Sequence, residues 1–597
     1  MQNVNDRIAL LREKMRELNL DAYLVPSSDP HQSEYVAEHW ESRTWLSGFT
    51  GSAGILVVTL DHAGLWTDSR YFLQAEEELS QNEVVLHKQQ VPYAPEHIPW
   101  LIDQLPKGST IGCDGYLFSY NELKGIEKIF AGKKINLNYT VDIVSQIWED
   151  RPPIPQYEAM EHGTKFAGKS RGEKLSDIRK KLHEAGADMY VVSTLDDIAW
   201  TLNIRGSDVD YNPVCISYLI IAINSAAWFV DSSKVSTKLA AEMKKDGISL
   251  LAYDKVEGIL KGTPSRAKLL VDPGTLNARL YEAIPDGLIV KGENIICNLK
   301  AIKNETEAGH IRKAMIKDGV ALLRFYRWLE ATLDAGETVG EAAAAEKLAG
   351  FRAQQEGYFG ESFGAIVGYE ANGAIVHYRA KEETCAQIEP KGILLLDSGG
   401  QYHDGTTDIT RTTALSTPTE EQKTNYTLVL KGNIALDMAK FPMGTTGVQL
   451  DTLARMFLWQ ECLNYGHGTG HGVGFFLNVH EPPQGITPNP LTSRGQNPML
   501  PGMFTSNEPG FYKTGEYGIR IENLVLCVEV EENEFGKFLG FETMTLFPID
   551  TTLINEDLLN DQEKQWLNDY HQMVFDRISP ELNEEEKQWL ADKCKAI

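Results

Sequence analysis

The same pattern of apolar and polar positions occurs twice in the first half of the chain. Residues 7–25 read RIALLREKMRELNLDAYLV, and residues 174–192 read KLSDIRKKLHEAGADMYVV. In both segments apolar residues recur every three or four positions and then form a short apolar run, which predicts an amphipathic helix followed by a strand. The similarity continues in WLSGFTG at 45–51 and WTLNIRG at 200–206. We therefore predict two copies of one α/β domain.

A proline-rich segment and a helix start mark the ends of the two copies. RPPIP at 151–155 contains three prolines, which cannot continue a helix or lie within a central strand. Near residue 302 the second copy ends, because the capping sequence NETE begins at Asn304 and a long amphipathic stretch follows it. We expect three domains, which span residues 1–150, 151–302 and 303–597.

The third domain mixes strand and helix patterns. Apolar or alternating runs bounded by glycine and proline predict strands, and they lie at residues 364–368, 392–397, 503–507 and 519–528. Helical periodicity predicts helices at residues 423–440 and 448–465. The expected fold class is therefore two α/β domains followed by an α+β domain.

The C-terminal tail reads as two helices, with a break near Ser579-Pro580. Its large apolar residues are expected to pack the tail against the third domain or against a second subunit, and they are Trp566, Leu567, Tyr570 and Trp589.

Acidic residues stand at the ends of the predicted strands. Asp397 ends the apolar run GILLLD, where an ionised carboxylate costs on the order of several kcal/mol unless a cation or a donor compensates it. Gly399-Gly400 indicates a turn, so we expect the chain to double back and bring Asp408 beside Asp397. Glu508 and Glu522 repeat this arrangement around a second turn. Carboxylates this close repel each other or share a proton, and a divalent cation removes the conflict.

One histidine completes the predicted metal site. His471, in GHGTGHGVG, adds one nitrogen to the four carboxylates, and this set suits two ions of manganese, cobalt, iron or zinc better than calcium. The set includes no thiolate, which argues against structural zinc. Strand alternation puts Arg520 and Glu522 on one face, so we expect Arg520 to contact a carboxylate that holds metal.

Three other histidines of this domain are candidates for a function: His377, His467 and His480. A hydrolase needs donors for the developing oxyanion and an acid for the leaving nitrogen. We interpret these histidines as functional because they accompany a predicted two-metal centre.

The composition limits which classes of partner and which cellular compartment we expect. The formal net charge of the 597 residues is −27, which disfavours nucleic acid and anionic membrane as partners. The seven cysteines form no CxxC pair and are odd in number, which favours a reducing compartment. The N-terminus has no apolar signal core, and no run approaches the roughly 18 apolar residues of a membrane span. We expect a cytoplasmic protein.

The motifs resemble those of the Xaa-Pro aminopeptidases (aminopeptidase P), pita-bread metallopeptidases, in their long cytosolic form. The resemblance covers nearly the whole chain and includes SSDPHQSEYVAEHW, WTDSRYFLQA, IVHYRA, LLLDSGGQYHDGTTDITRT, GHGTGHGVG, NEPGFY and RIEN. It implies two creatinase-like α/β domains and a pita-bread catalytic domain. Gly400 departs from the alanine that is common in the family, and we expect this to be harmless in a turn.

The resemblance also implies a function for each candidate residue. Two metal ions, usually manganese, would be bound by Asp397, Asp408, His471, Glu508 and Glu522, with Asp408 and Glu522 bridging them. Catalysis and peptide binding would involve Glu508, His377, His467 and His480, together with Arg70 of the first domain. The substrates would be peptides with proline at the second position, and the protein would be a homodimer.

Related activities are alternatives to this interpretation. A prolidase would use the same ligands on Xaa-Pro dipeptides only, but the repeated domain and the long chain favour the aminopeptidase. Methionine aminopeptidases lack the two added domains. Non-catalytic pita-bread binding modules have lost metal ligands, whereas this chain retains all five.

Overall fold

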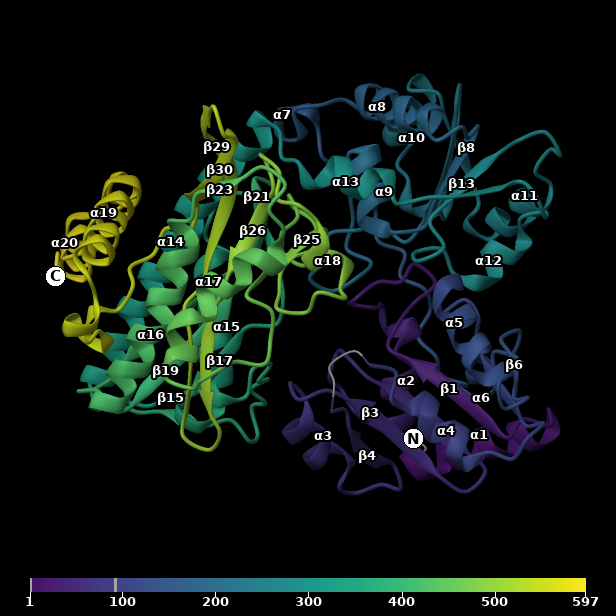
Figure 1. Cartoon of the computed structure of the whole chain (residues 1–597), viewed down its shortest axis with the longest axis horizontal. Coiled ribbons are helices and arrows are strands. Elements are labelled where there is room, and N and C mark those ends of the chain that lie inside the picture. The colour runs from purple at the N-terminus through teal and green to yellow at the C-terminus, as the bar shows by residue number, and fades with distance from the viewer. Residues whose placement is uncertain (1–2, 91–93) are drawn as a thin grey trace. The chain divides into compact units, whose positions relative to one another are not determined.

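The computed structural model describes residues 3–90 and 94–597. The chain divides into two compact units, Met1–Gly163 with Lys169–Ile296 and Thr164–Gly168 with Cys297–Ile597 (Figure 1). The first unit contains both copies of the predicted α/β domain, and the boundaries expected near residues 150 and 302 stay predictions. Among the described residues, no helix has the length and apolar character needed to cross a lipid bilayer.

The first repeat is a six-stranded sheet with helices. Helix α1 (Val4–Glu17) leads into strand β1 (Ala22–Pro26), as the sequence pattern predicted. The other strands are β2 (Ile55–Thr59), β3 (Ala63–Thr67), β4 (Val85–Lys88), β5 (Thr110–Cys113) and β6 (Asn136–Asn138). The sheet order is β4-β3-β2-β1-β5-β6. The helices that follow α1 are α2 (Ser42–Ser47), α3 (Phe72–Leu79), α4 (His97–Gln104), α5 (Tyr120–Ala131) and α6 (Val144–Ile147).

The second repeat has the same topology. Helix α8 (Arg171–Glu184) leads into β8 (Met189–Val192). The other strands are β10 (Tyr218–Ala222), β11 (Ala226–Phe229), β12 (Ile248–Leu251), β13 (Leu269–Val271) and β14 (Ile289–Lys291). The main helices are α9 (Leu195–Leu202), α10 (Thr237–Lys245), α11 (Val256–Lys261) and α12 (Ala278–Ala283).

The strand directions confirm the internal repeat. The second sheet has the order β12-β11-β10-β8-β13-β14. In each sheet the central strand, β1 or β8, pairs antiparallel on one side and parallel on the other. The outermost pairs, β3 with β4 and β11 with β12, are both parallel. Two segments with similar helix-strand patterns have therefore formed the same sheet.

The second unit opens with the long predicted helix. Helix α14 (Glu305–Asp334) starts at Asn304, whose side chain accepts hydrogen bonds from the Thr306 and Glu307 amides, while the Glu307 carboxylate accepts from the Asn304 amide. This reciprocal cap satisfies amides that would otherwise lack partners at the helix start. The other helices of eight or more residues are α15 (Glu341–Arg352), α16 (Glu420–Asp437), α17 (Gly447–Gln460), α19 (Asp561–Ile578) and α20 (Glu584–Lys593).

Two sheets of this unit carry most of the candidate residues. Strands β17 (Ile366–Tyr369), β19 (Ile393–Ser398) and β22 (Ile409–Ala414) form an antiparallel sheet in the order β17-β19-β22. The larger sheet contains β23 (Phe441–Pro442), β24 (Gly470–Gly472), β25 (Glu481–Ile486), β26 (Phe504–Asn507), β29 (Asn523–Asn533) and β30 (Gly536–Thr543). Its order is β23-β30-β29-β26-β24-β25. These strands confirm the predictions at 364–368, 392–397 and 503–507 to within about two residues.

The run predicted as one strand at 519–528 is two strands. Strand β28 (Tyr517–Arg520) pairs with β27 (Gly510–Lys513) in a hairpin, and β29 starts at Asn523. Residues Ile521 and Glu522 lie between them, outside any strand. The alternating pattern concealed this break because both residues are buried like their neighbours.

The prediction of a turn at Gly399-Gly400 is also wrong. The chain reverses between β20 (Gly400–Tyr402) and β21 (Gly405–Thr406), which pair with each other. Gly399 instead permits a close approach, since a Cβ there would lie 2.0 Å from the Thr407 carbonyl oxygen. Glycine at this point therefore reflects packing rather than a change of direction.

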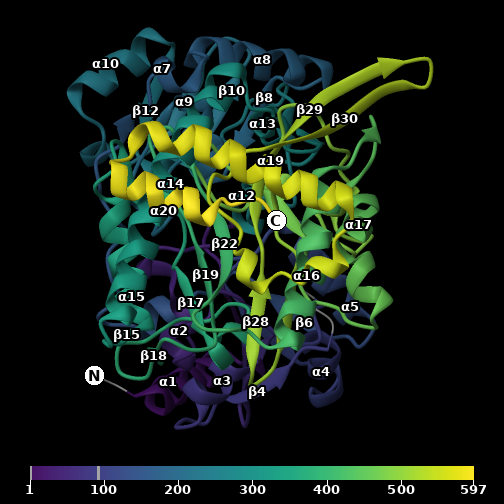
Figure 2. The same cartoon turned by 90° about the vertical axis from the view of Figure 1, so that its left-hand side faces the viewer.

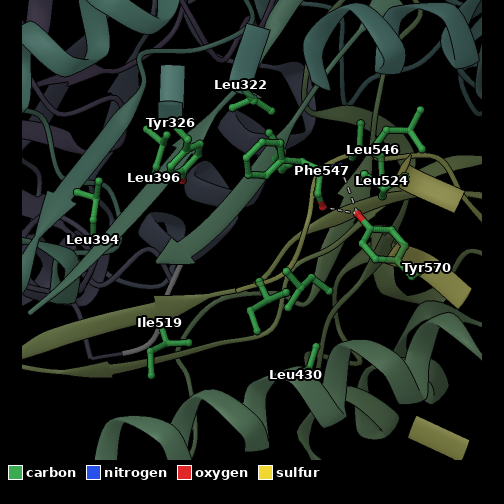
Figure 3. Packing of buried hydrophobic residues seen from close by; sticks show 14 of the residues in the cluster. Leu322, Tyr326, Leu394, Leu396, Leu430, Ile519, Leu524, Leu546, Phe547 and Tyr570 are labelled. Carbon is green, nitrogen blue, oxygen red and sulfur yellow. Dashed lines mark hydrogen bonds between the residues drawn. The ribbon is translucent and has the colours of Figure 1, made fainter. Parts of the chain in front are cut away.

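A large apolar cluster fills much of the second unit. It joins α14, β19, α16 and the β27–β28 hairpin (Figure 3), and its labelled members include Leu322, Leu394, Leu396, Leu430 and Ile519. Figure 2 shows α19 and α20 side by side at the surface of this unit. Leu567 and Tyr570 belong to the cluster, and Trp566 and Trp589 pack against it. The tail therefore packs on its own third domain, the first of the two alternatives predicted.

Helices α16 and α17 are close enough to require glycine at their contact. A Cβ at Gly432 would lie 2.1 Å from the Ala454 carbonyl oxygen. We expect Gly432→Ala to destabilise the protein by about 1–3 kcal/mol, as overpacking does in a filled core. Gly350→Ala is the matched control, because Gly350 is exposed on α15 with open space around its Cβ position. It should stabilise by about 0.5–1 kcal/mol. Thermal unfolding measures both effects, and a Gly432→Ala midpoint at or above the wild-type value would contradict the prediction.

Candidate metal centre

The two aspartates lie beside each other on neighbouring strands. Asp397 is the fifth residue of β19, and in the register with β22 it pairs with Thr410. Asp408 immediately precedes β22, and both side chains are buried. The predicted proximity is therefore present, although the chain reaches it through the β20–β21 hairpin.

The two glutamates flank one end of a strand pair. Glu508 follows β26 and Glu522 precedes β29, and the last pair of these strands joins Asn507 to Asn523. The β27–β28 hairpin forms the connection between them. Antiparallel pairing thus brings two acids that are 14 positions apart in the sequence to the same end of the sheet.

His471 brings the two acidic pairs together. It lies on β24, and its Nε2 is 3.5 Å from Asp408 Oδ2 and 3.5 Å from Glu508 Oε1. Its Nδ1 is 3.0 Å from the Gly472 carbonyl oxygen, which fixes the proton on Nδ1 and leaves the Nε2 lone pair facing the acids. Asp408, His471 and Glu522 each place one possible ligand atom within 4.8 Å of the other two.

The electrostatics of this group call for a cation. Burial raises the pKa of Asp408 well above its ordinary value, and the nearby Asp397 and Glu508 raise it further. Burial also raises the pKa of Glu522 and of Glu508. Burial lowers the pKa of His471 to about 4, so this imidazole is neutral and able to bind a metal. Asp397 Oδ1 is buried and has no hydrogen-bond partner among the described residues. Buried carboxylates and a free lone pair are the donors that a divalent ion uses.

Arg520 lies where the sequence predicted, against an acidic candidate ligand. One of its terminal nitrogens donates to Asp397 Oδ2 at 2.5 Å, and its Nε donates to Thr410 Oγ1 at 3.2 Å. The same Thr410 hydroxyl donates to Glu522 Oε2 at 2.8 Å. Arg520 and Glu522 therefore meet at Thr410, a residue that sequence reasoning missed.

Tyr512 is a second residue that was missed. Its hydroxyl accepts a hydrogen bond from Arg520 at 2.6 Å and lies 2.8 Å from His467 Nε2. This network links His467 to Arg520 and so to Asp397. A signal existed in the sequence, because Tyr512 lies two positions from Gly510, the partner of Arg520 across the hairpin, and so faces the same side.

Asn433 on α16 holds the backbone beside both glutamates. Its Nδ2 donates to the carbonyl oxygens of Asn507, at 2.9 Å, and Ile521, at 3.1 Å. These are the residues that immediately precede Glu508 and Glu522. Nothing in the local sequence indicated this contact, because it spans 74 and 88 positions along the chain.

The other two predicted histidines, His480 and His377, lie in different surroundings. The His480 ring is 4.3 Å from the His471 ring and perpendicular to it, so His480 borders the centre. His377 is partly buried in the turn that follows η4 (Glu370–Ala374), a short helix that packs against β27 and β28. The catalytic functions expected of these residues stay predictions.

Arg70 lies in the first unit. Its Nε and one terminal nitrogen donate to the two carboxylate oxygens of Asp68, each at 2.7 Å. The expected contact with a peptide stays a prediction.

Comparison with known proteins identifies the family of the chain. The metallopeptidase family M24 matches residues 309–529, and the C-terminal region of peptidase M24 matches residues 537–597. The creatinase/prolidase N-terminal domain matches twice, at residues 7–146 and 150–307.

Individual relatives match over nearly the whole chain. Aminopeptidase P2 of Arabidopsis thaliana is 41% identical, with 97% of this chain and 86% of that protein covered. A probable Xaa-Pro aminopeptidase P of Pyricularia oryzae is 42% identical, with 97% and 96% covered. The solved X-prolyl aminopeptidase of Caenorhabditis elegans, described as a cytosolic enzyme with a di-nuclear active site, is 35% identical, with a TM-score of 0.95 and 100% of both chains covered. The chain therefore belongs to the Xaa-Pro aminopeptidase P family, enzymes in which two creatinase-type domains precede an M24 metallopeptidase domain.

Proposed function

We propose that this chain releases the N-terminal residue of peptides whose second residue is proline, by hydrolysis at a centre of two divalent ions. The names of its relatives support the activity, and the di-nuclear active site of the C. elegans enzyme supports the two ions. One observation in the chain itself carries the proposal. Asp408, Glu508 and Glu522 crowd around one neutral imidazole, and burial raises the pKa of all three. Such a group is stable in its ionised form only with cations.

The five candidate ligands divide between the two ions. Asp408 and Glu522 would bridge them, Asp397 would complete one ion, and His471 with Glu508 would complete the other. Arg520 would orient Asp397, and Thr410 would orient Glu522, through the hydrogen bonds described above. These outer contacts matter because a ligand that is fixed before binding loses less entropy when the ion binds.

The side chains around the centre supply the proton transfers. The bound ions would lower the pKa of a water molecule and polarise the peptide carbonyl. Glu508 accepts the proton of the attacking water, and Ser506 Oγ, 3.2 Å from Glu508 Oε1, helps to hold that carboxylate. His480 donates to the developing oxyanion, and His377 protonates the leaving proline nitrogen. His467, held by Tyr512, contacts the peptide.

A dedicated site is needed because the bond before proline is unusual. The proline nitrogen is tertiary, so this bond offers no N–H to the enzyme and its φ is restricted. Arg70 of the first unit contributes to peptide binding in the same proposal. The protein is a homodimer in the cytoplasm, where the C. elegans enzyme is described as working. Peptides are its partners, and the net charge of −27 disfavours nucleic acid and membrane. Manganese is the ion, although cobalt, iron and zinc suit the same donors.

Removal of metal tests the proposal. We expect metal-stripped protein to lose activity on an Xaa-Pro-Xaa tripeptide by at least about 1,000-fold, because metal supplies several kcal/mol to the transition state. Two equivalents of Mn²⁺ per chain should restore it, as measured by elemental analysis and peptide cleavage on one preparation. A tripeptide with alanine at the second position is the substrate control, and an Xaa-Pro dipeptide tests for prolidase activity. Full activity without metal would refute the proposal.

A further inference from the structure

Glu522 is held mainly by β22 rather than by a sheet ladder. It lies in the two-residue break between β28 and β29. Its amide donates to the Thr410 carbonyl oxygen at 3.1 Å, and its carboxylate accepts from the Thr410 hydroxyl at 2.8 Å. Its own carbonyl oxygen accepts from the guanidinium of Arg411 at 2.6 Å. Two adjacent residues of β22 therefore determine where the Glu522 backbone and carboxylate lie.

Arg411 is a completely enclosed guanidinium, with 2% of the residue exposed. Besides the Glu522 carbonyl, it donates to the Thr410 carbonyl, the Asn523 side-chain oxygen, the carbonyls of Phe547 and Pro548, and the Tyr570 hydroxyl. These acceptors are all neutral oxygens. A buried cation is costly unless every donor is satisfied, and these six acceptors satisfy the five N–H groups of the guanidinium. One terminal nitrogen contacts three of the acceptors: the Asn523 side-chain oxygen, the Phe547 carbonyl and the Tyr570 hydroxyl. The acceptors together therefore set the orientation of the guanidinium.

The hydroxyl of Tyr570 connects this arginine to the C-terminal helices. Tyr570 lies on α19, and its oxygen accepts from Arg411 at 2.8 Å and donates to the Phe547 carbonyl at 2.8 Å, a bond drawn in Figure 3. The ring stacks on Trp566 with an interplanar angle of 2°, and the Trp566 indole N–H donates to Asp437 on α16 at 2.8 Å. The hydroxyl is therefore aimed by rigid packing on both sides.

We propose that Tyr570 and Arg411 are positioning residues of the metal centre, through which helix α19 sets the place of Glu522. The inference rests on the proposed function, in which Glu522 bridges the two ions. If the Tyr570 hydroxyl is lost, the terminal nitrogen that contacts it keeps two acceptors, the Asn523 side-chain oxygen and the Phe547 carbonyl. The guanidinium then turns toward these two oxygens, and its other terminal nitrogen shifts from the Glu522 carbonyl. The Glu522 backbone is then less constrained, and its carboxylate is held less firmly in the position from which it would bind the ions.

Tyr570→Phe tests the proposal, because it removes the hydroxyl and keeps the ring. Tyr326→Phe is the matched control: Tyr326 is buried in the same cluster, and its hydroxyl receives a weak hydrogen bond from Thr413 at 3.5 Å. The measurements are Mn²⁺ affinity of metal-stripped protein by calorimetry, thermal unfolding of that protein, and kcat and KM at saturating Mn²⁺.

We expect Tyr570→Phe to bind Mn²⁺ about 10-fold more weakly than wild type and to lower kcat about 10-fold, the lower end of the range for residues that orient metal ligands. KM should change less than about 2-fold, because the substrate contacts are intact. Tyr326→Phe should leave Mn²⁺ affinity and kcat within about 2-fold of wild type. This should hold even if its unfolding temperature falls as far as that of Tyr570→Phe.

The outcomes separate the inference from its premise. Two bound ions in the wild type with wild-type Mn²⁺ affinity in Tyr570→Phe would overturn the inference alone. Equal losses of affinity in both variants would also overturn it, since they would reflect general stability of the core. A wild-type protein that binds no divalent ion would instead overturn the proposed function and, with it, the inference.

Discussion

Asp408→Asn is expected to stabilise the metal-free protein and to abolish its metal-dependent activity. In the absence of metal, Asp408 is buried among other acids, and its pKa is raised well above the ordinary range by burial, Asp397 and Glu508. A neutral amide of the same shape removes that repulsion, so the free energy of unfolding should rise by about 1–4 kcal/mol. The amide cannot bridge two cations as a carboxylate does. Mn²⁺ binding should therefore be lost, and kcat/KM should fall by at least about 1,000-fold.

The stability of the metal-free proteins as a function of pH is a second test of this prediction. A carboxyl group whose folded pKa is raised binds a proton more readily in the folded protein, so it destabilises the fold as pH rises from the unfolded pKa toward the folded pKa. Metal-free wild type should therefore lose more stability than Asp408→Asn between about pH 4 and neutral pH. Histidines with a pKa lowered to about 4 have the opposite dependence in this window: His87, His97, His471 and His571. The difference between variant and wild type cancels the contributions of His87, His97 and His571, which do not contact Asp408. His471 lies 3.5 Å from Asp408, so its contribution is part of the measured difference.

Asp576→Asn is the control for the change in net charge, because Asp576 is exposed on α19. It should alter neither Mn²⁺ binding nor the pH dependence of unfolding. A metal-free Asp408→Asn protein that unfolds at a lower temperature than wild type at neutral pH would show that the four acids do not repel one another as described.

Local patterns in the sequence predicted the parts of this site that depend on local structure. The apolar run before Asp397 indicated a buried strand, and β19 is that strand. The capping sequence at Asn304 indicated the start of α14, and the duplicated helix-strand pattern indicated two sheets of one topology. In each case the determining interactions lie within a few residues of one another, so periodicity and capping residues were sufficient evidence.

The contacts that fix the ligands could not be predicted in the same way. Thr410, Arg411 and Asn433 reach Glu522 or its neighbour across about 90 to 110 positions, and each is an ordinary residue in its own element. Glycine was ambiguous as well, because Gly399 marks a close approach of two backbone segments although the same residue type often marks a turn. Long-range hydrogen bonds and steric limits produce no periodic pattern in the sequence, so they can be identified only once the pairing of the strands is known.

Glu508→Gln is expected to separate catalysis from metal binding. Glutamine keeps an oxygen that can bind an ion, and Ser506 can still donate to it, but it cannot accept the proton of the attacking water. We expect kcat to fall by about 100- to 10,000-fold, the usual contribution of a general base, while Mn²⁺ affinity falls by no more than about 10-fold. The measurements are steady-state cleavage of an Xaa-Pro-Xaa tripeptide at saturating Mn²⁺ and metal content of the same protein.

Glu516→Gln is the matched control, because Glu516 lies in the turn of the β27–β28 hairpin and its side chain is 54% exposed. It should change kcat by less than about 2-fold, since an exposed ion pair with Lys513 contributes little. If Glu508→Gln bound two ions and retained kcat within about 10-fold of wild type, another group would have to accept the proton. The same four acids are the candidate metal ligands and crowd one another, so only a variant that keeps the ions can show which of them also moves a proton. Among the candidate ligands, Glu508 is placed for this test because its carboxylate lies beside His471 and Ser506 at the end of β26, where a conservative amide preserves both neighbours.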